Sequence, residues 1–264
     1  MRIVRYVNEA GAAQWGEAVD KGHARPIPGD VFGARDVGGA PEQVIRRLAP
    51  VEPPNIIAIG RNYAEHAKEM KSESRTSEPL VFLKATTTVI GPEEPIVLPN
   101  SAPREVDFEA ELAIVIGCRA KEISEQDALA YVLGFTCAND VSARDCQKGD
   151  KQWARGKSFD TFCPLGPEVV TADALDASGL AIRSTLNGEV MQSGNTGDMI
   201  FSVPRLVSYL SFQFTLLPGT VILTGTPPGV GAARTPPVFL KDGDTITIEI
   251  EGIGRLTNRV QAAR

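Results

Sequence analysis

Hydrophobic and polar positions along most of the chain alternate, or gather in short apolar runs, in the way that is typical of β-strands. Apolar residues at helical spacing are confined to segments 41–49, 62–70, 124–132 and 203–211. The predicted strands cover residues 2–7, 55–60, 80–85, 95–99, 108–117, 133–140, 163–171, 180–188, 220–226 and 244–260. The pattern therefore predicts a β-rich fold of the α+β class.

A proline-rich segment, residues 49–55, separates a short leading part from the rest of the chain. Proline restricts the backbone and removes a hydrogen-bond donor, so this segment interrupts regular pairing. We predict a small N-terminal domain over residues 1–53 and a catalytic domain over residues 54–264.

Three carboxylates share one side of the predicted strand "VDFEAELAIVIG", residues 106–117. Because side chains in a strand alternate between faces, Asp107, Glu109 and Glu111 point the same way. One interpretation is a solvated outer face. The other is a site for a hard divalent cation, to which Asp140, at the end of a later strand, adds a third oxygen ligand. Asp140 could equally make a simple turn.

Lys157 stands among residues that favour burial, in the segment 155–167. A lysine in such a place commonly extends its amine to solvent. If the amine stays inside, its charge would balance the carboxylates or stabilise an oxyanion.

A short helix predicted over residues 62–70 carries a histidine and a glutamate three positions apart. His66 and Glu69 then share a face, so the carboxylate can orient the imidazole as a general base. The alternative is an exposed helix with an incidental pair. Asn62 is expected to cap this helix together with Glu65. The polar segment that follows, residues 71–79, predicts a mobile loop beside the base that could act as a lid.

Composition removes several other classes of protein. The chain of 264 residues has 27 basic and 33 acidic side chains, a formal charge of -6 and no long basic run, so nucleic acid is not an expected partner. No apolar run reaches the ~20 residues that cross a bilayer, and the opening residues turn polar too early for a signal peptide. We expect no membrane partner and a cytoplasmic location. Four cysteines without a CxxC pair and two histidines argue against a zinc site and for reduced thiols.

Three common catalytic schemes lack their sequence motifs. The segment "GTPPGVG", residues 225–231, has the wrong glycine spacing and two prolines for a dinucleotide-binding loop. The chain has no Walker A sequence and no GxSxG elbow. Acid-base chemistry at a metal site remains.

From Asn55 to Val260 the chain resembles the fumarylacetoacetate hydrolase family, because several motifs agree in sequence and in order. They are "GRNYAEHAKEM" (60–70), "VDFEAELAIVIG" (106–117), "NDVSARDCQ" (139–147), "GKSFDTFCPLGP" (156–167) and "LTGTPPGVG" (223–231). The resemblance implies a mixed β-sandwich roll, generally assembled as a homodimer.

The resemblance also implies roles for individual residues. Glu109, Glu111 and Asp140 match the family's ligands for Mg²⁺ or Mn²⁺, and Asp107 is expected to lie just outside this set. The matching catalytic residues are His66, Glu69 and Lys157. The matching substrate-binding residues are Arg61, Lys84, Arg144, Gln147 and Thr226.

These roles lead us to expect a hydrolase that cleaves the carbon–carbon bond of a 2,4-dioxo acid of the acylpyruvate type, giving pyruvate and a carboxylic acid. His66, held by Glu69, would activate water, and Lys157 would stabilise the oxyanion. The same site would serve an isomerase or decarboxylase of 2-oxo dicarboxylates, such as 2-hydroxyhepta-2,4-diene-1,7-dioate or oxaloacetate. The dyad favours hydrolysis or decarboxylation, since tautomerisation needs no activated water. A non-catalytic, metal-stabilised binding protein is a third hypothesis, and the histidine–glutamate pair counts against it.

Overall fold

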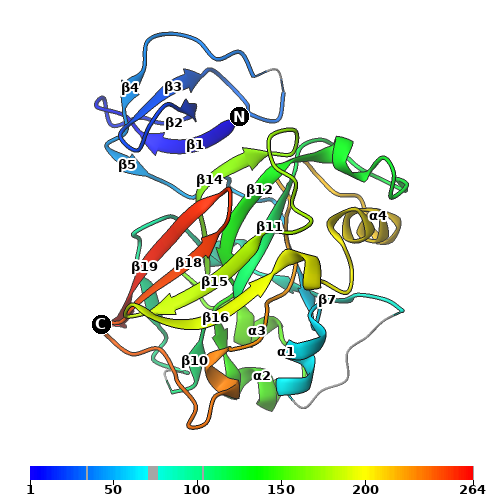
Figure 1. Ribbon diagram of the computed structural model, residues 1–264. Helices are drawn as coiled ribbons and strands as arrows, with labels where there is room; N and C mark the ends of the chain where they lie inside the picture. The colour runs from blue at the N-terminus through cyan, green and yellow to red at the C-terminus, as the bar shows by residue number, and fades with distance from the viewer. Residues whose placement is uncertain (34, 71–76, 103, 264) are drawn as a thin grey trace.

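The computed structural model describes residues 1–33, 35–70, 77–102 and 104–263. It is a β-rich α+β structure, a mixed β-sandwich roll, in which most of the described strands belong to one large sheet (Figure 1). These strands are β1 (Arg2–Val7), β2 (Ala13–Ala18), β3 (His23–Ile27), β4 (Glu42–Gln43), β5 (Arg46–Arg47), β6 (Ile56–Gly60), β7 (Leu80–Lys84), β8 (Val89–Ile90), β11 (Ala110–Ile116), β12 (Val132–Asn139), β14 (Cys163–Thr171) and β17 (Val221–Leu223). Their main order is β4-β3-β2-β1-β14-β12-β11-β17-β6-β7, with β5 paired to β1 and β8 to β14.

A second sheet packs against the middle of the first. Its order is β16-β15-β18-β19-β9, and β15, β18 and β19 contact β11, β12 and β14 of the large sheet. The strands of this sheet are β9 (Ile96–Leu98), β15 (Ala181–Leu186), β16 (Glu189–Asn195), β18 (Thr245–Ile250) and β19 (Gly254–Ala262). A short ladder joins β10 (Val106–Asp107) to β13 (Ser142–Ala143).

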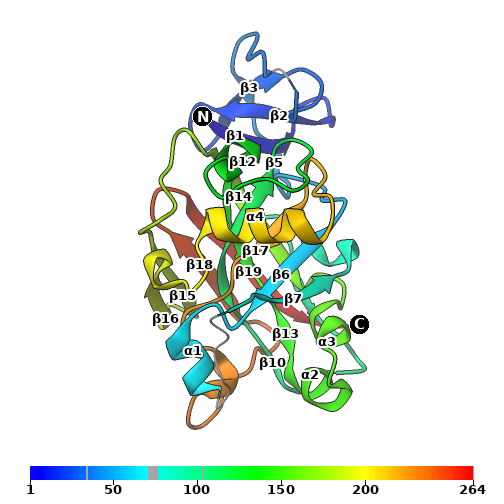
Figure 2. The same ribbon diagram turned by 90° about the vertical axis from the view of Figure 1, so that its right-hand side faces the viewer.

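Helices are short and occupy two places. The α-helices are α1 (Ala64–Glu69), α2 (Arg144–Asp150), α3 (Ala154–Lys157) and α4 (Val203–Gln213). The 3₁₀ turns are η1 (Thr86–Thr88), η2 (Ala128–Tyr131), η3 (Thr196–Asp198) and η4 (Gly231–Ala233). In both Figure 1 and Figure 2, α1, α2 and α3 gather at the end of the molecule opposite the N-terminal strands, whereas α4 lies apart from them.

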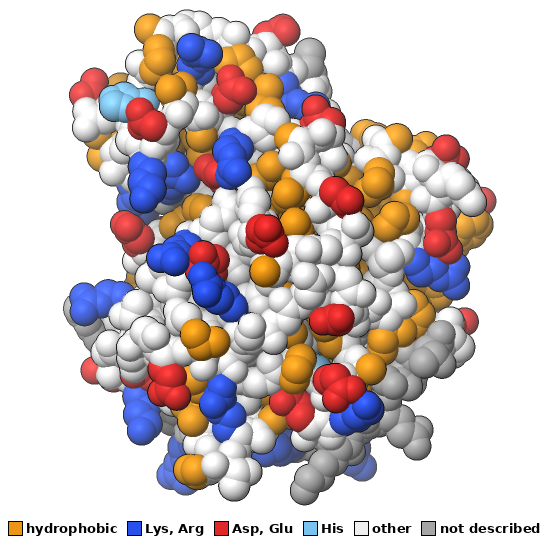
Figure 3. Space-filling view, viewed as in Figure 1, with side chains coloured by type: hydrophobic (Ala, Val, Ile, Leu, Met, Phe, Trp, Pro, Cys, Tyr) orange, Lys and Arg blue, Asp and Glu red, His pale blue; other side chains and the backbone are white. Residues whose placement is uncertain are grey.

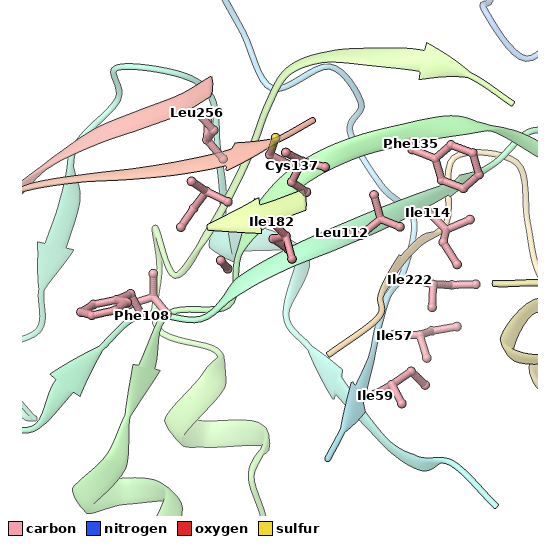
Figure 4. Close-up of a cluster of buried hydrophobic side chains, with 14 of the residues drawn as sticks. Ile57, Ile59, Phe108, Leu112, Ile114, Phe135, Cys137, Ile182, Ile222 and Leu256 are labelled. Atoms are coloured by element: carbon pink, nitrogen blue, oxygen red, sulfur yellow. The ribbon is translucent and has the colours of Figure 1, made fainter. Parts of the chain in front are cut away.

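The core is built on β11, whose seven residues are all buried. Figure 4 shows Leu112 and Ile114 of this strand packed beside Ile57, Ile222 and Phe135 from neighbouring strands. Both faces of β11 are covered, which explains the nearly continuous apolar run in its sequence. Burying each large aliphatic side chain contributes about 1.5–3 kcal/mol, so the strand that carries Glu111 is firmly held.

Two predicted helices differ from the structure. Residues 41–49 form β4 and β5, not a helix, because each short strand adds to an existing sheet edge: β4 to β3 and β5 to β1. Val44 between them packs against a small apolar cluster, so tertiary pairing overrides the helical spacing. The prediction over residues 124–132 shrinks to η2. The helix predicted at residues 203–211 is α4, capped by Ser202, whose hydroxyl accepts from the Arg205 amide.

The N-terminal strands extend the large sheet, since Arg2 and Ile3 of β1 pair with Val170 and Val169 of β14. Glu168 adds ion pairs to the side chains of Arg2 and Arg47. The division of the chain at residue 53 stays a prediction. Figure 3 shows acidic and basic side chains interspersed over the visible face. None of the helices in the described part of the chain is long and apolar enough to cross a membrane.

Candidate active site

Three carboxylates converge where β11 and β12 lie side by side. In the antiparallel register, Ala110 pairs with Asn139, the last residue of β12. Glu109 and Glu111 are the neighbours of Ala110 in the chain, and Asp140 directly follows Asn139. The Asp140 amide also donates to the Glu109 carbonyl at 3.0 Å. One oxygen from each of the three side chains lies within 4.8 Å of the others, and all three residues are buried. These oxygens form a set that suits a hard divalent cation.

Two buried lysines neutralise part of this acidic cluster. The Lys157 ammonium donates to Glu109 Oε2 at 2.9 Å and to Asp140 Oδ2 at 2.7 Å. Lys84 Nζ donates to Asp140 Oδ1 at 2.5 Å and also to the Lys157 carbonyl. Lys157 ends the short helix α3, so it is held in a helical turn and its amine stays inside.

Arg144, the first residue of α2, bridges two other acids. Its Nε donates to Asp107 Oδ1 and its Nη2 to Glu109 Oε1, both at 2.6 Å. Its Nη1 donates to Gln147 Oε1 at 3.0 Å. The Ala232 amide donates to the other oxygen of Asp107 at 2.8 Å. Asp107 is thus satisfied by protein groups, and it does not belong to the cluster of Glu109, Glu111 and Asp140.

Burial and neighbouring charges shift the pKa values of Glu109 and Glu111 in opposite directions. Burial alone would raise the pKa of Glu109, but the charges of Lys157 and Arg144 outweigh it and hold that pKa below its ordinary value. Burial, with the charges of Asp140 and Glu109, raises the pKa of Glu111 well above its ordinary value. The Gly225 amide donates a hydrogen bond to Glu111 Oε2 at 2.6 Å. When all four buried acids are ionised, their negative charges exceed the positive charges of Lys84, Arg144 and Lys157 by one, so the donor set fits a bound cation.

The predicted base lies on α1 beside this cluster. His66 Nδ1 is 2.8 Å from Glu69 Oε1, and the Gly229 amide donates to the same carboxylate at 2.9 Å. Both contacts fix Glu69, which in turn fixes the plane of the imidazole. His66 is buried, and a positive charge on its ring would lower the pKa of Glu109. The remaining ring nitrogen, Nε2, is free of the Glu69 contact and available for proton transfer.

Asn62 does not cap α1, contrary to the prediction. Tyr63 stands at the cap position without a side-chain hydrogen bond. The buried Asn62 amide instead donates to the carbonyls of Phe201 and Thr224 and accepts from the Phe201 amide at 2.7 Å. These long-range bonds tie the start of α1 to the end of β17, which a local capping rule cannot foresee.

A cavity of about 270 Å³, called the site cavity below, opens onto these groups. Among the predicted residues its lining includes Arg61, His66, Glu109, Glu111, Arg144, Gln147, Lys157 and Thr226. The lining does not include Lys84, Glu69 or Asp140. These three side chains form hydrogen bonds with residues that do line the cavity, namely His66 and Lys157. The predicted lid, residues 71–79, falls mainly on residues 71–76, which lie outside the described residues.

Two kinds of residue in this site were not predicted from the sequence. The buried Gln192 side chain donates to Thr226 Oγ1 at 2.7 Å and accepts from the Ala110 amide at 2.9 Å, so it positions the backbone between the two glutamates. Trp153 and Phe82 also line the site cavity. A buried amide or an aromatic ring has no distinctive sequence spacing, which is why neither was foreseen.

The family model described as "Fumarylacetoacetate (FAA) hydrolase C-terminal" matches residues 55–261. The chain belongs to the fumarylacetoacetate hydrolase family. This is a family of enzymes.

Two similar curated proteins are named oxaloacetate tautomerases. The chain is 50% identical over 224 residues to the mitochondrial oxaloacetate tautomerase of Bos taurus, covering 83% of this chain and 71% of that protein. It is 49% identical over the same length to the mitochondrial oxaloacetate tautomerase of Homo sapiens, with the same coverage.

Two solved structures are similar to this chain over nearly its whole length. The 5-carboxymethyl-2-hydroxymuconate delta-isomerase from Mycobacterium smegmatis is 41% identical with a TM-score of 0.89, covering 100% of both chains. The 2-hydroxyhepta-2,4-diene-1,7-dioate isomerase from Mycobacterium marinum is 42% identical with a TM-score of 0.87, covering 99% of this chain and 98% of that chain.

Proposed function

We propose that the protein is a divalent-cation-dependent tautomerase or isomerase of a small 2-oxo acid, which moves a proton between C3 and the 2-oxo oxygen. The observation that carries this proposal is a carboxylate-anchored imidazole, His66, in the same cavity as the buried acids Glu109 and Glu111. The names of the similar proteins favour this function over the acylpyruvate hydrolase expected from the sequence.

Glu109, Glu111 and Asp140 are the residues that would hold Mg²⁺ or Mn²⁺. When bound, such a cation would polarise the 2-oxo group of the substrate and so make the neighbouring C–H bond more acidic. Lys84 and Lys157 hold Asp140 in place from both sides, so this ligand has little freedom to rotate.

His66 Nε2 is the atom that would accept the proton from C3. The C–H electron pair then forms the C2=C3 bond, and the 2-oxo oxygen takes the negative charge. Return of the proton from the imidazolium to that oxygen completes the enol and regenerates the base. Glu69 supports each step because it stabilises the positive charge that forms on the ring.

Lys157 and Arg144 supply positive charge around the developing enolate. Both line the site cavity and are buried, so water screens their charges weakly. Each is already shared with Glu109, which keeps its head group fixed before substrate arrives. Such fixed charges stabilise an anion without reorganisation.

Hydrolysis of an acylpyruvate is the second candidate function, because the pair of His66 and Glu69 could also activate a water molecule. Decarboxylation of oxaloacetate would instead break the C3–C4 bond, whose electron pair forms the C2=C3 bond of pyruvate enolate as carbon dioxide leaves. All three reactions act on a 2-oxo acid, and they differ in the bond that breaks.

The test compares three reactions of metal-stripped protein with and without Mg²⁺ or Mn²⁺. Enol–keto conversion of oxaloacetate is followed by its ultraviolet absorbance, and pyruvate release is measured from oxaloacetate and from acetylpyruvate. We expect metal-dependent acceleration of the enol–keto conversion without pyruvate. Pyruvate from acetylpyruvate would establish the hydrolase instead, and pyruvate from oxaloacetate alone would establish a decarboxylase.

We also propose a homodimer and a cytoplasmic location, on the family resemblance and on the sequence respectively. Size-exclusion chromatography with light scattering tests the first, and fractionation of the source cells tests the second.

A further inference from the structure

One wall of the site cavity is a continuous stack of cationic and aromatic groups. The guanidinium of Arg61 lies 5.6 Å from the ring centroid of Trp153. Trp153 meets Phe82 edge to face, with ring centroids 5.2 Å apart, and Lys157 Nζ lies 5.4 Å from the Phe82 centroid. All four residues line the cavity, so the stack runs from the partly exposed Arg61 to the buried Lys157.

Local backbone structure fixes this wall. Trp153 precedes α3, and the Lys157 amide donates to the Trp153 carbonyl at 3.1 Å, so one helical turn presents the ring and the amine together. The ring packs on the end of β6, where a Cβ added at Gly60 would lie 2.4 Å from a Trp153 ring carbon. Only glycine admits the indole so close. Arg61, the next residue, has a φ of 60°, a strained conformation for a non-glycine residue.

The guanidinium of Arg61 is unpaired among the residues that the structure describes. No carboxylate of that part of the chain forms an ion pair with it, and its described interaction is the contact with Trp153. Arg144 in the same cavity contrasts with it, because Arg144 is saturated by Asp107, Glu109 and Gln147. A partly buried, preorganised guanidinium facing a cavity is suited to a carboxylate, which it can bind through two hydrogen bonds.

We infer that Arg61, held against Trp153, is the subsite for a second, distal carboxylate of the substrate, and that Trp153 is the positioning residue that sets its selectivity. The inference rests on the proposed function, since it takes the first carboxylate and the 2-oxo group to be the chelating end. The substrate class is then a short 2-oxo dicarboxylate. Monocarboxylates of the same length leave the guanidinium unpaired in a partly desolvated place.

The test measures binding, not turnover, with two inert 2-hydroxy acids that differ by the distal carboxylate. Malate and lactate are titrated by calorimetry into the full-length protein loaded with Mn²⁺. We expect the wild type to bind malate about tenfold more tightly than lactate, the effect of one charge-assisted contact that is partly exposed. Arg61→Gln should reduce that ratio to about one and leave the affinity for lactate unchanged.

Trp153 is tested through the same ratio. Trp153→Ala should lower the malate preference at least about threefold, because the guanidinium loses the surface that orders it. Trp153→Phe keeps an aromatic face and should restore most of the preference. Arg205→Ala is the matched control, because Arg205 is a partly exposed arginine outside the site cavity and forms an ion pair with Glu125. Its ratio should equal the wild-type value. A thermal melt of each variant checks that it is folded.

Two results would overturn the subsite: a wild type that binds neither acid or shows no preference, or an Arg61→Gln variant that keeps the wild-type ratio. If Trp153→Ala keeps the wild-type preference for malate over lactate, Trp153 has no positioning role, and the assignment of Arg61 is unaffected. The proposed reaction fails separately, because a protein that prefers malate but does not interconvert the tautomers of oxaloacetate would keep the subsite and lose the tautomerase function.

Discussion

The site cavity and a second, larger cavity in the same chain show that chemistry, and not volume, marks the functional region. The site cavity measures about 270 Å³ and the second about 690 Å³. The second cavity lies beside α4 and is lined by Leu129, Phe135, Ala172, Asp173, Ala174, Leu175, Asp176, Ala177, Ser178, Thr196, Gly197, Met199, Ser202, Val203 and Pro204.

The two linings differ in how their charges are held. In the second cavity the charged lining residues are Asp173 and Asp176, both exposed, with no basic residue among the lining. The site cavity instead joins buried acids to buried bases at hydrogen-bonding distance. Burying such groups is costly unless each is paired, so their accumulation in one place indicates a site built for charged ligands.

The largest difference between the cavities is expected in catalysis. His66→Ala should lower tautomerase turnover about 10³-fold, because a general base contributes roughly 10² to 10⁴. Calorimetry should find Mn²⁺ affinity unchanged, since His66 is not one of the three proposed ligands. Leu129→Ala in the second cavity should keep wild-type turnover. Normal turnover in His66→Ala would remove His66 as the base.

The next difference concerns stability. Asp140→Ala leaves Lys84 and Lys157 buried with fewer partners, so the free energy of unfolding should fall by about 3 kcal/mol. Asp173→Ala, which removes an exposed acid from the second cavity, should change it by less than about 0.5 kcal/mol. Urea unfolding in the presence of a chelator measures both. Equal effects would mean that the buried ion pairs add little to stability.

Removing the charge of Glu69 should lower turnover less than removing the imidazole of His66. Glu69→Gln keeps the shape of the side chain but loses the charge that stabilises the imidazolium, so turnover should fall about 10- to 100-fold. The pH dependence of turnover should move with it, whereas Mn²⁺ affinity should not. A loss as large as that of His66→Ala would show that the histidine cannot work without the carboxylate.

The smallest effect is a gain in stability from removing one acid. The pKa of Glu111 is raised in the folded protein by burial, Asp140 and Glu109, so folding is disfavoured as pH rises above the ordinary value of 4.5. In chelator, Glu111→Gln should therefore be more stable than wild type at neutral pH, by less than the loss expected for Asp140→Ala. The difference should shrink as pH falls toward 4.5, where Glu111 is protonated in folded wild type. With Mn²⁺ the order should reverse, because only wild type keeps all three ligands.

Much of the strand pattern and part of the site were predictable from local spacing. Alternation along residues 106–117 put Asp107, Glu109 and Glu111 on one side, and Arg144 does bridge the first two. The spacing of His66 and Glu69 predicted their contact, since residues three apart on a helix share a face. The helix predicted at residues 41–49 was wrong because neighbouring sheet edges offered its backbone better partners.

The sequence by itself determined which chemical groups are present and which short-range neighbours they have, because strand and helix periodicities are set by backbone geometry. The tertiary structure alone decided their partners over longer distances. It assigned Asp107 to Arg144 and the Ala232 amide, drew Lys84 into the cluster behind Asp140, and turned Asn62 from a cap into a link between α1 and β17. It also brought Trp153 against Gly60 and left Arg61 unpaired among the described residues. Such contacts depend on which segments pack together, and packing is decided by the whole core, with no signal in the local order of residues.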